Sequence, residues 1–219
     1  MAATSETETA GRPVRLPRSA RRKQLLAAAQ EVFVAQGYHA AAMDDIAEQA
    51  GVSKPVLYQH FPGKLELYLA LLDTHAEVLV GKIRSAMIAT SDNKERVAGA
   101  IRAYFEFVGD ASGAFRLVFE SDLRNEPAVR ERVDRVERHC IDAIKETIMG
   151  DTGVGRAPAE LLAAGLVGVA VTAARFWLAG GRQVPKDEAE HLVSTLAWRG
   201  IGGFPLHGEA HPVDEPTID

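Results

Sequence analysis

The sequence predicts an all-α fold, and two observations carry that prediction. Apolar residues recur at intervals of three and four along most of the chain, which is the period of one face of an α-helix. No stretch alternates apolar and polar residues for long enough to indicate a strand. The chain has 219 residues, of which 47% are hydrophobic, so one or two globular domains with ordinary cores are expected.

The net charge and the cysteine count narrow the class of protein. The net charge of −5 argues against non-specific coating of nucleic acid by the whole surface, but it leaves room for a local basic patch. A single cysteine excludes an intramolecular disulfide framework and suits a reducing interior, so we expect a cytoplasmic protein. Residues 1–17 lack the apolar core of a secretory signal, and we expect them to form a disordered arm.

A basic cluster leads into the first predicted helix. Six cations occur with no acid among them: Arg12, Arg15, Arg18, Arg21, Arg22 and Lys23. They are either a solvated tail or an arm that reaches DNA phosphates or the minor groove. The helix is expected over residues 18–36, and Gly37 should end it. Its buried stripe contains Leu25, Leu26, Ala29, Val32 and Phe33.

Residues 42–61, AMDDIAEQAGVSKPVLYQHF, predict two short helices joined by a tight turn. Gly51 can take the positive φ that follows a helix end. Ser53 is a candidate N-cap for the second helix, and Pro55 suits its first turn. Leu57 and Phe61 are four residues apart and should be buried together.

The exposed face of the second short helix favours a helix-turn-helix that binds DNA. Short helix pairs with a glycine turn are common in all-helical proteins, so the spacing alone does not decide. This face, however, offers hydrogen-bond donors and a cation, and no acid occurs in residues 51–64. A helix of this length fits the DNA major groove, and its N-terminal amides can face phosphates.

The segment GVSKPVLYQHFPGKLELYLALL, with GYHAAAMDDIA upstream, resembles the DNA-binding segment of TetR-family transcriptional regulators. The resemblance covers residues 18–72. It implies a three-helix DNA-binding domain over residues 18–62, then a helical effector-binding and dimerisation domain over residues 63–200. The family usually has hydroxyl residues at the positions of Ala41 and Ala42, where they cap a helix and touch a phosphate. No such contact is expected here, although Asp44 could accept at that helix start.

The same resemblance assigns roles on the DNA. Base edges should face Lys54, Pro55 and Val56, with Gln59 as a candidate base reader. Phosphates should contact Tyr58, His60 and Lys64, with Arg18 and Arg21 adding affinity. Two symmetry-related recognition helices should meet a palindromic operator with half-sites about 34 to 36 Å apart.

Six further helices are expected in the second domain. Apolar periodicity and breakers place them at residues 64–89, 93–109, 115–123, 127–150 and 161–199, the last stretch holding two helices. Asp92 should cap the second of these, and GDTGVGRAP should be a loop. Residues 201–219 should be a flexible tail. Its His207, Glu209 and His211 are compatible with a metal site, but a tail without metal is the simpler interpretation, and no cofactor is expected.

Residues 161–177 are the most apolar stretch, and a transmembrane helix is one interpretation. Thr172 and Arg175 interrupt the run, which falls short of the roughly 18 to 20 clean residues of a span. By the resemblance, this helix and the helix at residues 186–199 pair with their twofold mates in a homodimer. A monomer with both helices in its core is the alternative, and no membrane partner is expected.

The sequence contains no motif for catalysis: no P-loop, nucleotide-binding GxGxxG, nucleophile elbow or HExxH. Cys140 lies on an apolar stripe and is expected to be an inert core thiol. Aromatic residues of the second domain could each simply fill a core, yet together they suit an apolar ligand. The expected effector-binding residues are Phe105, Phe115, Phe119, Ile144, Phe176 and Trp177.

The stretches RLPRSARRKQLL, AFRLVFESD, CIDAI and GLVG followed by ARFWL resemble FasR-like regulators of fatty-acid synthesis, which respond to long-chain acyl-CoA. That implies an acyl-CoA or similar apolar effector. One alternative is a TetR-type repressor of an efflux or antibiotic-related gene that responds to a different small molecule. A pocket for a cationic compound of that kind would need acidic residues, and Glu106 and Glu120 are the candidates. A helical lipid carrier without DNA activity is the other alternative.

Overall fold

The computed structural model describes residues 16–110, 113–119, 123 and 125–200, and every regular element in these ranges is a helix. The side chains of residues 116, 118 and 119 are not described. The all-α prediction is confirmed. The helices are α1 (Arg18–Ala40), α2 (Met43–Gln49), α3 (Lys54–His60), α4 (Lys64–Ile88), α5 (Asn93–Gly109), α6 (Ala114–Phe119), α7 (Pro127–Thr152), α8 (Arg156–Ala179) and α9 (Lys186–Arg199).

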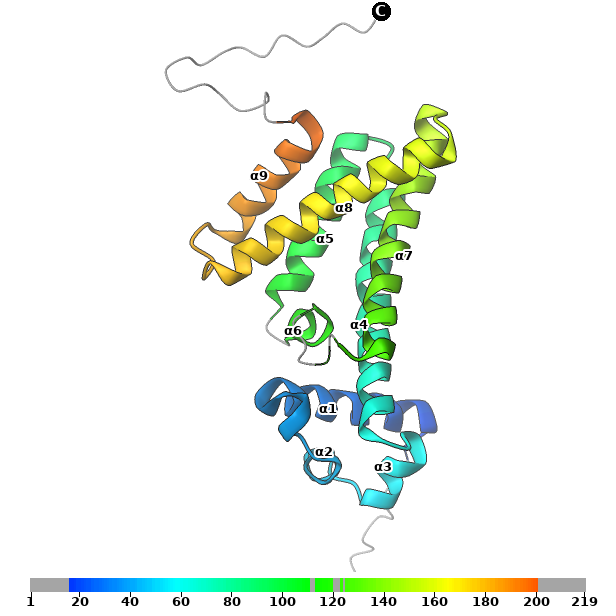
Figure 1. Ribbon diagram of the computed structural model, residues 1–219, viewed down its shortest axis with the longest axis vertical. Coiled ribbons are helices and arrows are strands. Elements are labelled where there is room, and N and C mark those ends of the chain that lie inside the picture. The colour runs from blue at the N-terminus through cyan, green and yellow to red at the C-terminus, as the bar shows by residue number, and fades with distance from the viewer. Residues whose placement is uncertain (1–15, 111–112, 120–122, 124, 201–219) are drawn as a thin grey trace, which may run out of the picture.

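Helices α1, α2 and α3 form a small head at one end of the molecule (Figure 1). Their apolar stripes meet in a closed core in which Leu25, Ile46, Leu57 and Phe61 are almost wholly buried. Gly37 has φ of 78° and ψ of 165°, so regular helix stops there as expected. One further helical turn carries α1 on to Ala40.

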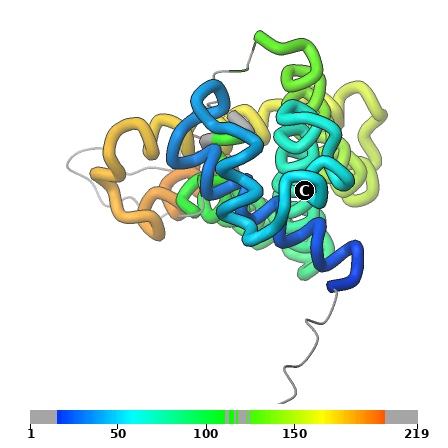
Figure 2. The backbone as a smooth tube through the Cα atoms, turned by 90° about the horizontal axis from the view of Figure 1, so that it is seen from below, coloured from blue at the N-terminus to red at the C-terminus, as the bar shows by residue number. Residues whose placement is uncertain are grey.

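The second domain is a bundle built on α4, which rises out of the head (Figure 1). Helices α5 and α7 pack along α4, α8 packs on α7 and α5, and α9 packs on α5. Seen from the head end, α1 to α3 cover the base of the bundle, while α9 and the end of α8 lie to one side (Figure 2). Since α4 contacts both α1 and α7, the domain boundary at residue 62 stays a prediction.

Several predicted helix limits agree with the structure, whereas α1 ends later and α8 begins earlier than expected. Helix α9 and the start of α4 agree, and the Asp92 carboxylate caps α5 by accepting from the Lys94 amide at 2.8 Å. The loop expected over GDTGVGRAP is shorter than expected, at residues 153–155, because α7 continues to Thr152 and α8 begins at Arg156. Ser53 holds the N-cap position of α3 as expected, but its side chain makes no capping hydrogen bond.

Helix α8 is long and apolar enough to cross a membrane by length and composition alone. Only 28% of its most apolar window is buried within the single chain. Leu161 and Phe176 are 76% and 80% exposed on it, so α8 has an apolar face that this chain does not cover. The expected basic residues Arg12 and Arg15 and the tail over residues 201–219 lie outside the described residues.

Candidate DNA-binding surface and effector cavity

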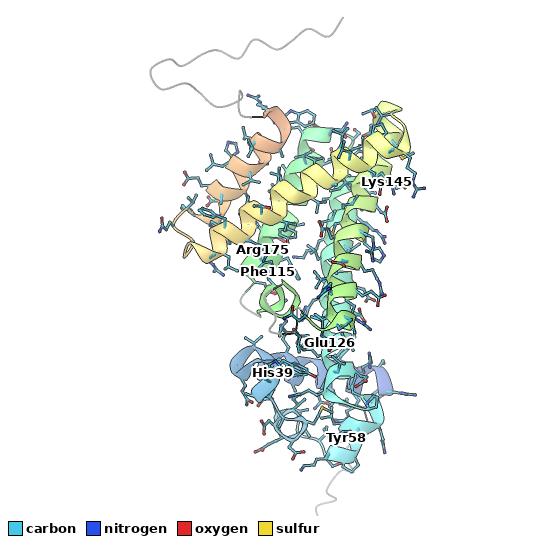
Figure 3. The ribbon with its side chains drawn as sticks, viewed as in Figure 1. His39, Tyr58, Phe115, Glu126, Lys145 and Arg175 are labelled. Carbon is cyan, nitrogen blue, oxygen red and sulfur yellow. The ribbon has the colours of Figure 1, made fainter. Side chains whose placement is uncertain are left out.

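Helix α3 separates its residues into a buried side and an exposed side. Leu57 is fully buried, whereas Lys54, Pro55, Tyr58 and Gln59 are exposed. Figure 3 shows Tyr58 on α3, at the end of the molecule remote from α8 and α9. The core therefore holds a short helix rigidly while its polar side chains stay available to a partner.

A hollow of about 540 Å³ lies between the start of α1 and α3. Five of the nine expected DNA-binding residues border it: Arg18, Arg21, Val56, Gln59 and His60. Partial burial lowers the pKa of His60, and the cations Arg18, Arg22 and Arg21 lower it further. This part of the head is therefore a positively charged surface made by two helices.

Lys54 reaches back from α3 to α2, where its ammonium pairs with the Asp44 carboxylate. Both side chains are more than half exposed, at 60% and 56%. An exposed ion pair of this kind contributes little to stability, so Lys54 can exchange Asp44 for a phosphate or a base edge at small cost. Asp44, expected to accept at the start of α2, is instead occupied by Lys54.

The Lys64 side chain, at the start of α4, is bonded to the protein itself. Its ammonium donates to three carbonyl oxygens around the end of α1: Tyr38 at 2.9 Å, His39 at 3.2 Å and Ala41 at 2.8 Å. It also lies 4.6 Å from the centre of the Tyr38 ring. All three of its donors are engaged within the protein, which gives Lys64 a structural role, and its expected phosphate contact stays a prediction.

Aromatic residues join the head to the second domain. Tyr68 of α4 donates its hydroxyl to the Leu117 carbonyl of α6 at 2.6 Å. Its ring lies edge-on to Phe33 and Tyr38 of α1, both with centroids at 5.2 Å. Helices α1, α4 and α6 thus share one packed junction, through which a shift of α4 or α6 would reach α1.

The second domain contains a partly open cavity of about 720 Å³ among α4, α5, α7, α8 and α9. Its walls are mainly apolar and include Leu79, Ile83, Met87, Ile101, Val136, Ile144, Leu166 and Val167. Glu137 and Asp151 both border it and are 14 residues apart on α7, which corresponds to about 21 Å of helix. The volume and the apolar lining suit a ligand with one hydrocarbon chain.

Of the six expected effector-binding residues, only Ile144 lines this cavity. Phe105 and Phe115 are buried in the core away from it, and Trp177 packs on Phe105 with its indole N–H donating to Val184 O at 2.7 Å. Phe176 is 80% exposed. The Phe119 side chain lies outside the described residues. Bulky aromatic rings fill cores efficiently, which is why most of them close the structure instead of leaving a space.

The polar residues that do line the cavity have only weak signals in the sequence. Tyr104 and Cys140 lie on apolar stripes, and Arg175 is the charge that interrupts the apolar run of α8. Burial raises the pKa of the Cys140 thiol to about 12 and raises the pKa of Tyr104 as well, so both groups are neutral at pH 7. Arg96 is ion-paired with Asp151.

Comparison with known proteins agrees with this arrangement. Residues 25–71 match the family described as bacterial regulatory proteins, tetR family. The HTH-type transcriptional activator FasR of Mycolicibacterium smegmatis is 48% identical over 192 residues, which are 88% of each chain.

Solved structures resemble the whole chain and not only the head. A TetR-like transcriptional regulator from Rhodococcus sp. RHA1 has a TM-score of 0.68 at 30% identity, covering 87% of this chain and 100% of that one. FadR from Bacillus subtilis, solved in complex with stearoyl-CoA, has a TM-score of 0.68 at 20% identity, covering 82% and 98%, and so shares the fold. The chain therefore belongs to the TetR family of transcriptional regulators, which bind DNA and are not enzymes.

Proposed function

We propose that this regulator controls genes of fatty-acid or lipid metabolism, and that a long-chain acyl-CoA or similar apolar molecule sets its affinity for DNA. The observation that carries the proposal is the apolar cavity of about 720 Å³, which borders α4. The identity to FasR supports it, and so does the stearoyl-CoA bound to FadR, a protein of the same fold. A regulator of this kind would work in the cytoplasm.

On the DNA side, we propose that α3 enters the major groove. Lys54, Pro55 and Val56 would approach base edges with Gln59, while Tyr58 and His60 would contact phosphates. Arg18 and Arg21 border the same hollow as His60 and would follow the phosphate backbone. The support is the exposed polar side of α3 over a fully buried Leu57.

We propose that two chains form a homodimer through α8 and α9. The support is the set of large apolar residues exposed there: Leu161, Leu162, Phe176, Leu192, Leu196 and Trp198. A soluble monomer would seldom expose so many together. Phe176→Asp should convert the dimer to a monomer in sedimentation and abolish tight binding to a palindromic operator. Lys94→Asp, on the exposed start of α5, is a control that should do neither.

We propose that the cavity acts on the DNA through α4. Leu79, Ile83 and Met87 of α4 form part of the cavity wall, and the same helix begins at Lys64 beside the end of α1. A ligand that fits one tilt of α4 better than another would change the separation of the two α3 helices. The coupling free energy would be about 1 to 3 kcal/mol, a typical value for allosteric coupling.

Operator binding with and without oleoyl-CoA tests the proposal, with CoA alone as the ligand control. The variant Ala100→Phe would project a ring into the cavity, and it should bind the operator while losing the response to oleoyl-CoA. No change in operator affinity with any acyl-CoA would reject the effector and leave the DNA-binding role intact.

The rival assignment to an efflux repressor has little support from its candidate acids. Glu106 does not line the cavity and accepts from Lys82 at 2.9 Å, and Glu120 lies outside the described residues. A lipid carrier would lack the exposed polar side of α3. A titration of upstream DNA by fluorescence anisotropy separates that class, because a carrier would give no specific binding.

A further inference from the structure

Arg175 is unusual among the residues that line the cavity. It lies on α8 and is partly buried, at a wall that is otherwise mainly apolar (Figure 3). The other cation of the lining, Arg96, has its guanidinium bonded to Asp151, Asn93 and the Thr90 carbonyl. Within the described part of the chain, Arg175 has no ion pair and no hydrogen bond.

The surroundings of Arg175 supply no charge that would neutralise it. Burial is the main cause of the raised pKa of Tyr104. The Arg175 guanidinium lowers that pKa, whereas Cys140 and Glu137 raise it. Tyr104 and Cys140 are neutral, for the reason given above. Glu137 is exposed and does not come within ion-pair distance of Arg175. A guanidinium that is partly removed from water without an acidic partner is unfavourable. An anionic ligand that pairs with Arg175 would offset this cost.

We infer that Arg175 binds the anionic group of a ligand whose hydrocarbon chain fills the rest of the cavity. A guanidinium can donate two parallel hydrogen bonds to one carboxylate or phosphate, which fixes the direction of the ligand as well as its affinity. The chain would then run from Arg175 along α7 toward Ile144 and Ile148. The inference rests on the proposed function in taking the cavity as the effector site.

Two sources could supply that anion, and they can be separated. A free fatty acid carries its carboxylate on the chain itself. An acyl-CoA has a neutral thioester at that position and carries its phosphates beyond it. Oleate, oleoyl-CoA and the neutral oleyl alcohol share one hydrocarbon chain and therefore isolate the head group.

The experiment measures binding of these three ligands by calorimetry to the full-length parent and to three variants. Arg175→Gln keeps the size and polarity of the side chain but removes its charge, and Arg175→Lys keeps the charge. Arg156→Gln is the matched control, because Arg156 is an exposed residue of the same helix outside the cavity lining.

We expect Arg175→Gln to weaken binding of at least one anionic ligand by about tenfold or more, because it removes a charge-assisted hydrogen bond. Binding of oleyl alcohol should stay within about twofold, since burial of its chain is unchanged. Arg175→Lys should recover part of the loss, and Arg156→Gln should change nothing. Whichever anion loses affinity is the group that Arg175 holds.

Equal affinities of Arg175→Gln and parent for both anions would overturn the inference, and so would an equal loss for oleyl alcohol. If Arg175→Gln fails to fold, the unmodified protein alone still tests the inference, which requires this protein to bind an anionic ligand more tightly than oleyl alcohol. If the unmodified protein binds none of the three ligands, both the inference and the proposed effector are overturned. Binding without any change in operator affinity would overturn the regulatory proposal alone.

Discussion

The head and the second domain place their functional groups in opposite ways. In the head, Leu25, Ile46 and Leu57 close a packed core, and the groups assigned to DNA are exposed side chains outside it. In the second domain, the candidate site is a partly open space of about 720 Å³ between the helices. A surface that binds a stiff DNA duplex benefits from a well-packed core beneath it. A binding site for a hydrocarbon chain instead requires a cavity, where side chains do not pack against one another. The two regions should therefore respond differently to the same kind of substitution.

The largest expected effect comes from removing one aliphatic side chain in each region. Leu57→Ala leaves a new cavity in the closed core of the head and should lower the free energy of unfolding by about 2 to 5 kcal/mol. Ile144→Ala enlarges a space that already exists, so its cost should be at the low end, about 2 kcal/mol or less. Thermal and denaturant unfolding of the two variants measures this difference.

The two variants should also differ in function. Leu57→Ala should lose operator binding with its folded head, while Ile144→Ala should keep operator binding and respond to a bulkier apolar ligand. Equal destabilisation by both substitutions would mean that the cavity wall is packed as firmly as the head, and the contrast between the regions would be lost.

Two lysines of the head offer a second contrast of nearly the same size. Lys64→Met removes a charged donor from three carbonyls and should destabilise the protein by about 2 to 3 kcal/mol. Lys54→Met removes only an exposed ion pair and should change stability by less than about 1 kcal/mol. Lys54→Met should instead weaken operator binding and alter its dependence on salt or base sequence.

The alternative outcome for Lys64 is well defined. If Lys64→Met kept its melting temperature, weakened binding to every DNA sequence and flattened the salt dependence, Lys64 would be a phosphate contact after all. In that case its hydrogen bonds to Tyr38, His39 and Ala41 would be exchanged for DNA on binding.

Local features of the head could be predicted from the sequence because they depend on neighbours in the chain. The turn at Gly51 and the Leu57 and Phe61 pair follow from spacing alone, and both are found in the structure. Lys64 shows the limit of that approach. Its partners are about 25 residues away in the sequence, so nothing in its own motif separates a carbonyl partner from a phosphate.

The cavity was harder to predict because it depends on where side chains fail to meet. The pattern of Phe105 and Trp177 correctly marks helices that face one another, yet these rings pack together and fill the space. What remains open lies between small and aliphatic residues of five helices, such as Ala100, Gly165 and Ala170. No single stretch of sequence records that coincidence. In the sequence, Arg175 stands out only as an interruption of an apolar run.

A substitution at Gly81 tests whether flexibility of α4, the helix that joins the two regions, matters. Gly81 lies within α4, is exposed, and has no atom within 4 Å of the position that a Cβ would take. Gly81→Ala should therefore raise the stability of α4 by about 0.5 to 1 kcal/mol, seen as a higher melting temperature. Gly81→Ser should give a smaller gain. If Gly81→Ala also changed the effector response, flexibility at this point of α4 would be part of the coupling.

The smallest expected effect concerns pH and the charged surface of the head. Partial burial and the cations Arg18, Arg22 and Arg21 lower the pKa of His60, so the free protein carries it neutral at pH 7. A DNA phosphate beside His60 would favour the protonated form and raise that pKa in the complex. The complex would then bind more protons than the free protein, so operator affinity should rise as the pH falls from about 7 through the usual value near 6.5. The rise should level off below the lowered pKa of the free protein, where both states are protonated.

Operator affinity measured between pH 5.5 and 8 at constant ionic strength, roughly the range over which histidine titrates, tests this. His60→Gln should flatten the profile, while His39→Gln, an exposed histidine at the end of α1, should leave it unchanged. Because His60 faces a hollow bordered by cations, the sign of the slope is informative. An affinity that fell on acidification would mean that no phosphate reaches His60, and the hollow between α1 and α3 would lie outside the DNA contact.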